Sequence, residues 1–270
     1  MNGFVKHTSI EYLRLYFKFI KMIVMSRMMY KLDTLLLSFS VLIRESVMVI
    51  TLFLMLTRFH EIQGWDMNSL LLMYSFVFLT YSLCVFVFTG VRDFEGSVHN
   101  GDFDGYLTKP ISPLFHIISK KSDIMASFGH GGLGLILFLY SFDKAGLDWS
   151  FKMFLIIPWL LLGGVLIQGA LLLLCAAITF WTIKSSEIQN ILFYQTRTFI
   201  AYPISIYPKF IQIILTFIVP LAFVNYYPSH YLIQNEIIWL YLSPIVGIAA
   251  FAIAYSLWRI GLLRYKSTGN

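Results

Sequence analysis

The chain has 270 residues, of which 58% are apolar and only 13% are charged, and its mean hydropathy is +0.75. A soluble domain carries about a quarter charged residues, so this composition excludes an ordinary water-soluble protein. One membrane-spanning helix uses about 20 residues, which leaves room for about six spans and for no sizeable soluble domain. We interpret the net charge of +6 as information about membrane orientation, and nucleic-acid binding is not implied.

Residues 1–33 are predicted to form an interfacial helix. The sequence Thr8-Ser9-Ile10-Glu11 has the spacing of a capping box, which favours a helix start. Basic residues then recur on one helix face and apolar residues on another: Arg14, Lys18 and Lys21 against Leu13, Phe17, Ile20 and Val24. A basic amphipathic helix of this kind lies in the headgroup region of a membrane and does not cross it.

Six apolar stretches predict an all-α integral membrane protein with one transmembrane domain over residues 1–270. They are residues 34–57, 69–90, 122–142, 153–183, 186–204 and 236–260. The fourth stretch is long and contains Pro158 and Gly163-Gly164, so we expect it to tilt or kink. The fifth runs into Tyr202-Pro203-Ile204-Ser205-Ile206-Tyr207-Pro208, where the two prolines should end the helix.

Residues 205–232 are predicted to form a re-entrant element in the outer leaflet. The apolar run 209–219 is too short to span a bilayer, and Pro220 closes it. A second short run is expected to end at Asn225-Tyr226-Tyr227-Pro228. Half-helices that dip into the membrane are tolerated where protein or an aqueous cavity satisfies their backbone groups. Four prolines mark the element, namely Pro203, Pro208, Pro220 and Pro228.

The distribution of basic residues predicts the orientation. With the N-terminus in the cytoplasm, 14 of the 20 Lys and Arg residues lie inside and four lie outside. The positive-inside rule therefore places both termini in the cytoplasm. A seventh crossing through residues 209–226 would put the basic tail outside, which the same rule disfavours.

Three ionisable residues are expected within the membrane. Arg44 and Glu45 lie near the middle of residues 34–57, and Arg197 lies close to the Tyr-Pro break. Such residues are costly unless they are paired or hydrated. Adjacent residues point about 100° apart on a helix, so Arg44 and Glu45 are able to find partners on other helices. We interpret the pair either as part of a substrate or proton pathway or as a structural ion pair, and Arg197 either as a cavity residue or as a headgroup anchor.

No sequence motif of a soluble enzyme is present. The chain lacks a Gly-rich loop ending in Gly-Lys-Ser/Thr, and its six histidines have no metal-ligand spacing. We therefore expect no catalytic residue, no metal and no cofactor on this chain. His130, within Gly129-His130-Gly131-Gly132, is interpreted as a polar residue at a close helix contact and not as a proton or metal site.

The polar stretch 91–121 carries the strongest functional signal. Acidic residues dominate its first half, on the side of the membrane where bases are favoured. Apolar residues are interleaved with them: Asp93, Glu95, Asp102 and Asp104 alternate with Phe94, Val98, Phe103, Tyr106 and Leu107. Several apolar side chains in one loop are normally shielded from water by other parts of the protein or by a partner. The loop is therefore either folded back on the inner ends of the spans or a docking surface for a cytoplasmic protein.

The run Gly101 to Pro110 reads Gly-x-Phe-Asp-x-Tyr-Leu-x-Lys-Pro. Together with the interfacial helix, the six spans and the proline-broken element, it makes the chain resemble the permeases of type-2 ATP-binding-cassette (ABC) exporters. The resemblance covers essentially the whole chain. It is strongest for a branch with a Tyr-Pro series, here Tyr202-Pro203, Tyr207-Pro208, Pro220 and Tyr226-Tyr227-Pro228.

The resemblance implies a permease in a bacterial cytoplasmic (inner) membrane that dimerises with itself or with a related permease. It also implies two copies of a separate ATPase, which holds the ATP and Mg²⁺, and an amphipathic cargo such as a lipid, glycolipid, peptide or drug. By this resemblance residues 93–100, with Asp93, Phe94, Glu95 and Val98, form a coupling helix. Asp102, Asp104, Lys109 and Pro110 would shape the adjoining turn.

Two other classes compete with this interpretation. A secondary transporter or channel would use Arg44 and Glu45 as a relay and would have broken helices in both halves, whereas only the second half shows a break. An integral membrane enzyme would need clustered histidines or acids at one membrane face, and the histidines are scattered.

Overall fold

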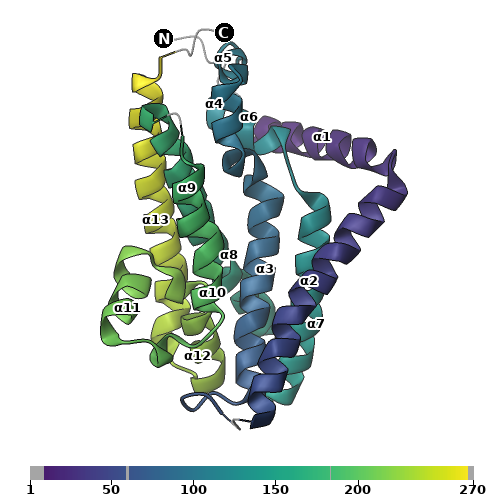
Figure 1. Cartoon of the computed structure of the whole chain (residues 1–270), viewed down its shortest axis with the longest axis vertical. Coiled ribbons are helices and arrows are strands. Elements are labelled where there is room, and N and C mark those ends of the chain that lie inside the picture. Colours follow the sequence, from purple (N-terminus) through teal and green to yellow (C-terminus); the bar gives the residue numbers. More distant parts are fainter. Residues whose placement is uncertain (1–8, 59–60, 183, 267–270) are drawn as a thin grey trace.

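A computed structural model describes residues 9–58, 61–182 and 184–266. Within these ranges the regular structure is helical, apart from one isolated bridge between Ile62 and Trp65. Figure 1 shows long helices running side by side, with one helix lying across the end of the bundle. The start of α1 (Ser9–Met28) and the end of α13 (Ile237–Arg264) lie at this same end (Figure 1).

Five helices in the described ranges are long and apolar enough to cross a membrane. They are α2 (Lys31–Arg58), α3 (Met67–Arg92), α7 (Ile124–Lys144), α8 (Phe151–Thr182) and α13. Each one corresponds to a predicted span. The prediction of an all-α, multi-pass membrane protein is thereby confirmed.

The predicted span 186–204 is shorter than a full span. It consists of α9 (Ser186–Gln189), the π-helical turn η1 (Asn190–Gln195) and α10 (Thr196–Ile200). These 15 consecutive residues, which we call the connecting segment, reach about 22 Å, against a hydrocarbon core of about 30 Å. A sixth span therefore stays a prediction.

The chain nevertheless passes along the bundle between Ser185 and Tyr226. Ser185 is bonded to Glu95, which follows the last turn of α3. Tyr226 packs on Trp65, just before the first turn of α3, with ring centroids 5.2 Å apart. These contacts lie at opposite ends of α3.

Helix α1 lies across the bundle, as expected for an interfacial helix (Figure 1). None of its residues is buried. It rests on α6 (Pro113–Lys120) through edge-to-face contacts of Tyr12 with Phe115 and of Phe19 with His116. The predicted cap at Thr8 lies outside the described residues.

Glycines allow α8 to pack closely against two neighbours. A Cβ at Gly247 of α13 would lie 2.6 Å from the carbonyl oxygen of Gly163, and a Cβ at Gly164 would lie 2.6 Å from Thr80 of α3. Helix α8 continues through Pro158 and through the glycine pair. The glycines that we expected at a kink therefore lie at helix crossings, where small residues allow close approach.

The proline-rich element contains short helical runs toward the end of the bundle away from α1 (Figure 1). The runs are η2 (Ile204–Ile206), α11 (Lys209–Ile213) continuing as the π-helical η3 (Ile214–Ile218), η4 (Leu221–Phe223) and α12 (Tyr226–Gln234). Pro203, Pro208 and Pro220 each directly precede a run, where a missing backbone N–H is tolerated.

Pro228 has a different place from the one predicted. It does not end a run but lies in the first turn of α12, where the backbone N–H has no partner within the helix in any case. Tyr226 and Tyr227 lie in the same turn. The sequence Asn225-Tyr226-Tyr227-Pro228, which we expected to end a short apolar run, therefore begins a helix. Whether the element enters the membrane stays a prediction.

Candidate functional site

The polar stretch after α3 folds into two short helices. Helix α4 (Phe94–His99) matches the predicted coupling helix, and Gly101, with a φ of +75°, separates it from α5 (Asp102–Leu107). Residues 102–107 are therefore helical, which differs from the turn that we expected. Lys109 and Pro110 lie in the link between α5 and α6.

Apolar side chains attach α4 and α5 to the bundle. Phe94 and Phe103 are fully buried, with ring centroids 5.0 Å apart. The Phe94 ring also lies 5.3 Å from Phe180 of α8 and 4.8 Å from Trp258 of α13. The sequence left open whether this stretch folds back on the spans or forms a docking surface. Its apolar residues fold back on the spans at four positions, which are all buried: Phe94, Val98, Phe103 and Tyr106.

Phe94 and Val98 face the bundle. Each is at most 1% exposed, so their side chains fix α4 on the ends of the long helices. Their role in coupling to an ATPase stays a prediction. Leu107, in contrast, keeps 37% of its surface exposed.

Glu95 joins α4 to the connecting segment. Its Oε2 accepts hydrogen bonds from the Ser185 backbone N–H at 2.6 Å and from the Ser185 hydroxyl at 3.2 Å, and its Oε1 accepts one from the Ser186 hydroxyl at 3.3 Å. Partial burial opposes ionisation, but the bonds from Ser185 and Ser186 outweigh it and hold the pKa of Glu95 below its usual value. Glu95 thereby caps the start of α9 from another part of the chain.

Two further predicted acids also bond within the chain. Asp93 accepts from Arg92 Nε at 3.0 Å and from Lys121 Nζ at 3.4 Å. Asp104 accepts from the hydroxyl of Tyr265, which follows α13, at 3.0 Å. Both carboxylates therefore help to hold the two short helices in place.

The remaining predicted residues face outward. Asp102, Lys109 and Pro110 are exposed. They share this surface, which we call the coupling face, with other exposed residues of the same stretch; it consists of His99, Asn100, Asp102, Leu107, Lys109 and Pro110. A role for this face in binding an ATPase stays a prediction.

The three predicted intramembrane charges lie together. Glu45 of α2 is 6% exposed, and its Oε2 lies 3.2 Å from Arg197 Nη2 of α10. The other oxygen, Oε1, lies 3.0 Å from Arg44 Nη2. The structural ion-pair interpretation thus describes Glu45 and Arg197, which are 152 positions apart.

Two residues that sequence reasoning did not assign to this site complete it. His130 of α7 is 1% exposed, and its Nδ1 lies 3.8 Å from Glu45 Oε1. The Arg197 guanidinium lies 3.9 Å above the ring of Tyr81 in α3, a cation–π contact. The glycines beside His130 did signal a close contact, since Gly129 lies against Val41 of α2. No sequence signal marks Tyr81.

This intramembrane cluster, formed by Arg44, Glu45, Tyr81, His130 and Arg197, has an excess of positive charge. Arginine stays protonated in proteins, and Glu45 supplies at most one negative charge against two guanidinium groups. Within the five long helices, Glu45 is the one acidic residue that lies away from the helix ends. The side chain of Arg44 is 67% exposed. In the part of the chain that the structure describes, no three His, Cys, Asp or Glu residues group as metal ligands do.

The connecting segment is thus held at both ends by glutamates from other elements. Glu95 binds its first residues, and Glu45 binds Arg197 near its last turn. The π-helical turn η1 lies between the two attachment points. The stretch after α3 and the middle of α2 are thereby joined through one short stretch of helix.

Residues 42–269 match a known family, which is described as ABC-2 family transporter protein. No curated protein sequence and no solved structure matches the chain.

Proposed function

Because the chain belongs to the ABC-2 family of transporter proteins, we propose that it is the permease of an exporter driven by a separate ATPase. Proteins of this family are the membrane component of an ABC transporter and associate with an ATP-binding subunit. The absence of a phosphate-binding loop from the sequence agrees with ATP and Mg²⁺ being held by that subunit. The proposed assembly contains two copies of the ATPase and a second permease, either identical or related. It lies in a bacterial cytoplasmic membrane with both permease termini inside.

The observation that carries the proposal is the attachment of α4 to several distant elements at once. Phe94 packs against aromatic rings of α8 and α13, and Glu95 caps α9. Packed aromatic contacts have low compressibility and transmit displacement. A push on the coupling face would therefore move the inner ends of these helices together.

The connecting segment offers a route from the coupling face to α2. A displacement of α4 would reach Ser185 through Glu95, and then Glu45 through Arg197. In the apolar 18-residue stretch of α2 only 17% of the residues are buried, against 78% in the corresponding stretch that begins with α3. Helix α2 therefore has fewer contacts that resist its movement. The two nucleotide states of the ATPase would supply the free energy by binding the coupling face differently.

The proposed cargo is amphipathic, such as a lipid, glycolipid, peptide or drug. The exposed part of α2 carries large apolar side chains, among them Leu35, Phe39 and Phe53, and also the exposed Arg44. An apolar surface with one fixed cation suits a molecule that has both apolar and polar parts. In this proposal the cargo passes along α2, between the two permeases.

Purification of the affinity-tagged chain from its native membranes tests the assignment. We expect a Walker-type ATPase to be recovered in a fixed ratio to the permease. Recovery should fall when Asp102 on the coupling face is replaced by Lys. Asp148→Lys is the matched control, because Asp148 is also exposed but lies in the link between α7 and α8, away from α4.

The competing function is a secondary transporter in which Arg44 and Glu45 act as a relay. In that case the purified chain alone, reconstituted in vesicles, would move solute down an ion gradient without ATPase. Such transport at full rate would overturn the exporter assignment. Absence of transport until the ATPase and ATP are added would support it.

A further inference from the structure

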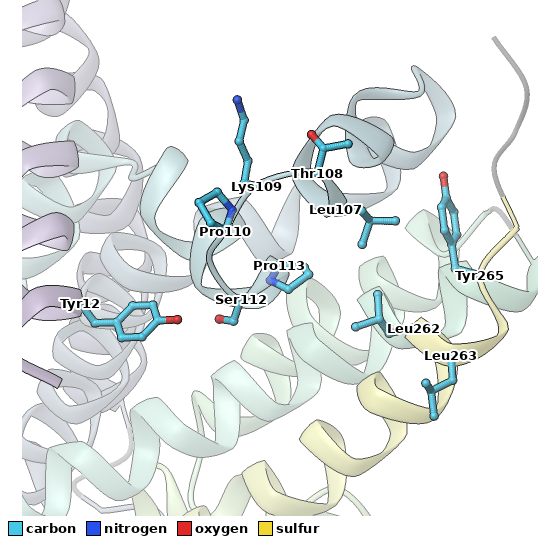
Figure 2. Close-up of a pocket in the computed structure, with 10 residues that line it drawn as sticks. All are labelled: Tyr12, Leu107, Thr108, Lys109, Pro110, Ser112, Pro113, Leu262, Leu263 and Tyr265. Atoms are coloured by element: carbon cyan, nitrogen blue, oxygen red, sulfur yellow. The ribbon is translucent and has the colours of Figure 1, made fainter. Parts of the chain in front are cut away.

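Two adjoining hollows form a groove along the outer side of the bundle at the end occupied by α1. The first, of about 710 Å³, lies between Tyr12 of α1, the link from α5 to α6, and the end of α13 (Figure 2). The second, of about 630 Å³, continues from it between α6, α8 and α13. The two hollows share Ser112, Pro113 and Leu262, so they are parts of one groove.

The part of the groove beyond Arg259 matches one leaflet of a bilayer in length. Along α13 the second hollow runs from Leu262 to Ile248, and the eleven residue steps between Arg259 and Ile248 cover about 16 Å of helix. Half of a hydrocarbon core is about 15 Å. Between these two residues the wall is largely apolar, with Phe251, Ala252 and Leu166 facing the groove.

Charge is confined to the cytoplasmic part of the groove. Lys109 and Arg259 are the charged residues in the two linings, and both are basic and exposed. The Lys109 ammonium group is directed away from the hollow in Figure 2, so it stands at the rim, while Arg259 lines the second hollow near Leu262, where the two hollows join. The groove therefore combines a cationic mouth with an apolar interior.

We propose that this groove binds one acyl chain of an anionic phospholipid from the cytoplasmic leaflet, with the lipid phosphate held by Arg259, while Lys109 at the rim contributes only its positive charge. Guanidinium groups bind phosphate oxygens through charge-assisted hydrogen bonds. A peptide is a poorer occupant, because its backbone N–H and C=O groups would lack partners along the apolar wall. The lipid would fill the space between α6 and α13 and so support the coupling region from the membrane side.

The test is native mass spectrometry of the purified permease titrated with phosphatidylglycerol. The expected result is one tightly retained lipid in the unmodified chain. Arg259→Gln should weaken retention about fivefold and Lys109→Gln should weaken it less. Ala252→Trp, which fills the groove from an exposed position, should abolish retention. Arg264→Gln is the matched control, because Arg264 is an exposed base of the same helix outside the groove.

Two ligand comparisons test the chemistry. Phosphatidylcholine should bind more weakly than phosphatidylglycerol, and glycerol phosphate, which has no acyl chain, should not compete. Equal retention of the two lipids, competition by glycerol phosphate, or equal loss in Arg259→Gln and Arg264→Gln would overturn the proposal. Thermal unfolding of each variant identifies any loss of binding that comes from misfolding. None of these measurements needs the ATPase, so their outcome is independent of the proposed transport function.

Discussion

Glu95 and Glu45 hold the two ends of the same connecting segment by different chemistry. At the end of the segment near α4, Glu95 accepts hydrogen bonds from neutral N–H and O–H groups of Ser185 and Ser186. Inside the bundle, Glu45 pairs with the charged side chains of Arg44 and Arg197. The first attachment resembles a helix cap, and the second is a buried ion pair at the middle of a candidate membrane span.

The two attachments should therefore differ in strength. Loss of a helix cap costs about 1 kcal/mol, because water partly replaces the lost bond. Loss of one partner from a buried ion pair costs about 3–5 kcal/mol, because the other charge is left unpaired in a medium of low dielectric constant. The connecting segment would thus be firmly tied to α2 and more loosely tied to α4.

The largest change is expected from removing the apolar anchor beside Glu95. Phe94→Ala leaves a cavity among Phe103, Phe180 and Trp258 and should lower the free energy of unfolding by about 3–5 kcal/mol. Thermal unfolding in detergent measures the effect. Leu107→Ala on the coupling face is the control and should change stability little, since Leu107 is partly exposed. Equal effects of the two variants would contradict the proposed attachment of α4.

Glu45→Gln breaks the attachment inside the bundle. We expect a loss of about 2 kcal/mol, less than for a fully buried pair, because Arg44 is exposed and the Arg197 side chain keeps 18% of its surface accessible. Adding Arg197→Gln should restore part of this loss, because the more buried of the two cations is then removed together with its partner, while Arg44 is largely exposed. A double-mutant cycle on unfolding midpoints measures the coupling. Strict additivity would show that Glu45 and Arg197 do not interact.

Glu95→Gln breaks the attachment at α4 and should cost about 1 kcal/mol. Because the pKa of Glu95 is lowered in the folded protein, its stabilisation is present above the unfolded carboxyl pKa of about 4.3 and is lost as the pH falls through the folded pKa. The difference in unfolding midpoint between the unmodified chain and the variant should therefore be larger at pH 7 than at pH 3. A pH-independent difference would contradict the cap assigned to Glu95.

The smallest effect on stability is expected on the coupling face. Asp102→Lys changes an exposed side chain and should alter the free energy of unfolding by no more than about 0.5 kcal/mol. The same variant should weaken binding of the ATPase. Co-purification together with thermal unfolding separates the two quantities. Unchanged recovery of the ATPase would remove Asp102 from the contact surface.

Several features could be predicted from local sequence patterns. Five spans were placed within four residues of the observed helices, because about 20 consecutive apolar residues are visible without tertiary information. The break before Pro203 follows from the backbone limits that proline imposes. The membership of the transporter family was also expected, from the interfacial helix, the spans, the run Gly101 to Pro110 and the proline-broken element taken together, and this resemblance implied the short helix after α3.

Other features depended on packing between distant parts of the chain. Phe94 and Val98 lie in a polar stretch that local pattern cannot distinguish from an exposed docking loop, and only the rings of α8 and α13 bury them. The π-helical turn η1 has no sequence signal that we recognised. The sequence does not identify the partners of Arg44, Glu45 and Arg197. Helix geometry shows in which direction a side chain points, but it does not show which helix lies there.

By itself, the sequence determined that this chain is a multi-pass helical membrane protein, because hydropathy and proline act on consecutive residues. The tertiary structure alone decided that Glu45 meets Arg197, that Glu95 caps α9, and that α4 rests on aromatic rings from two spans. These contacts join residues about 90 to 160 positions apart. Their partners are chosen by how the helices pack, and the order of residues along the chain does not record that choice.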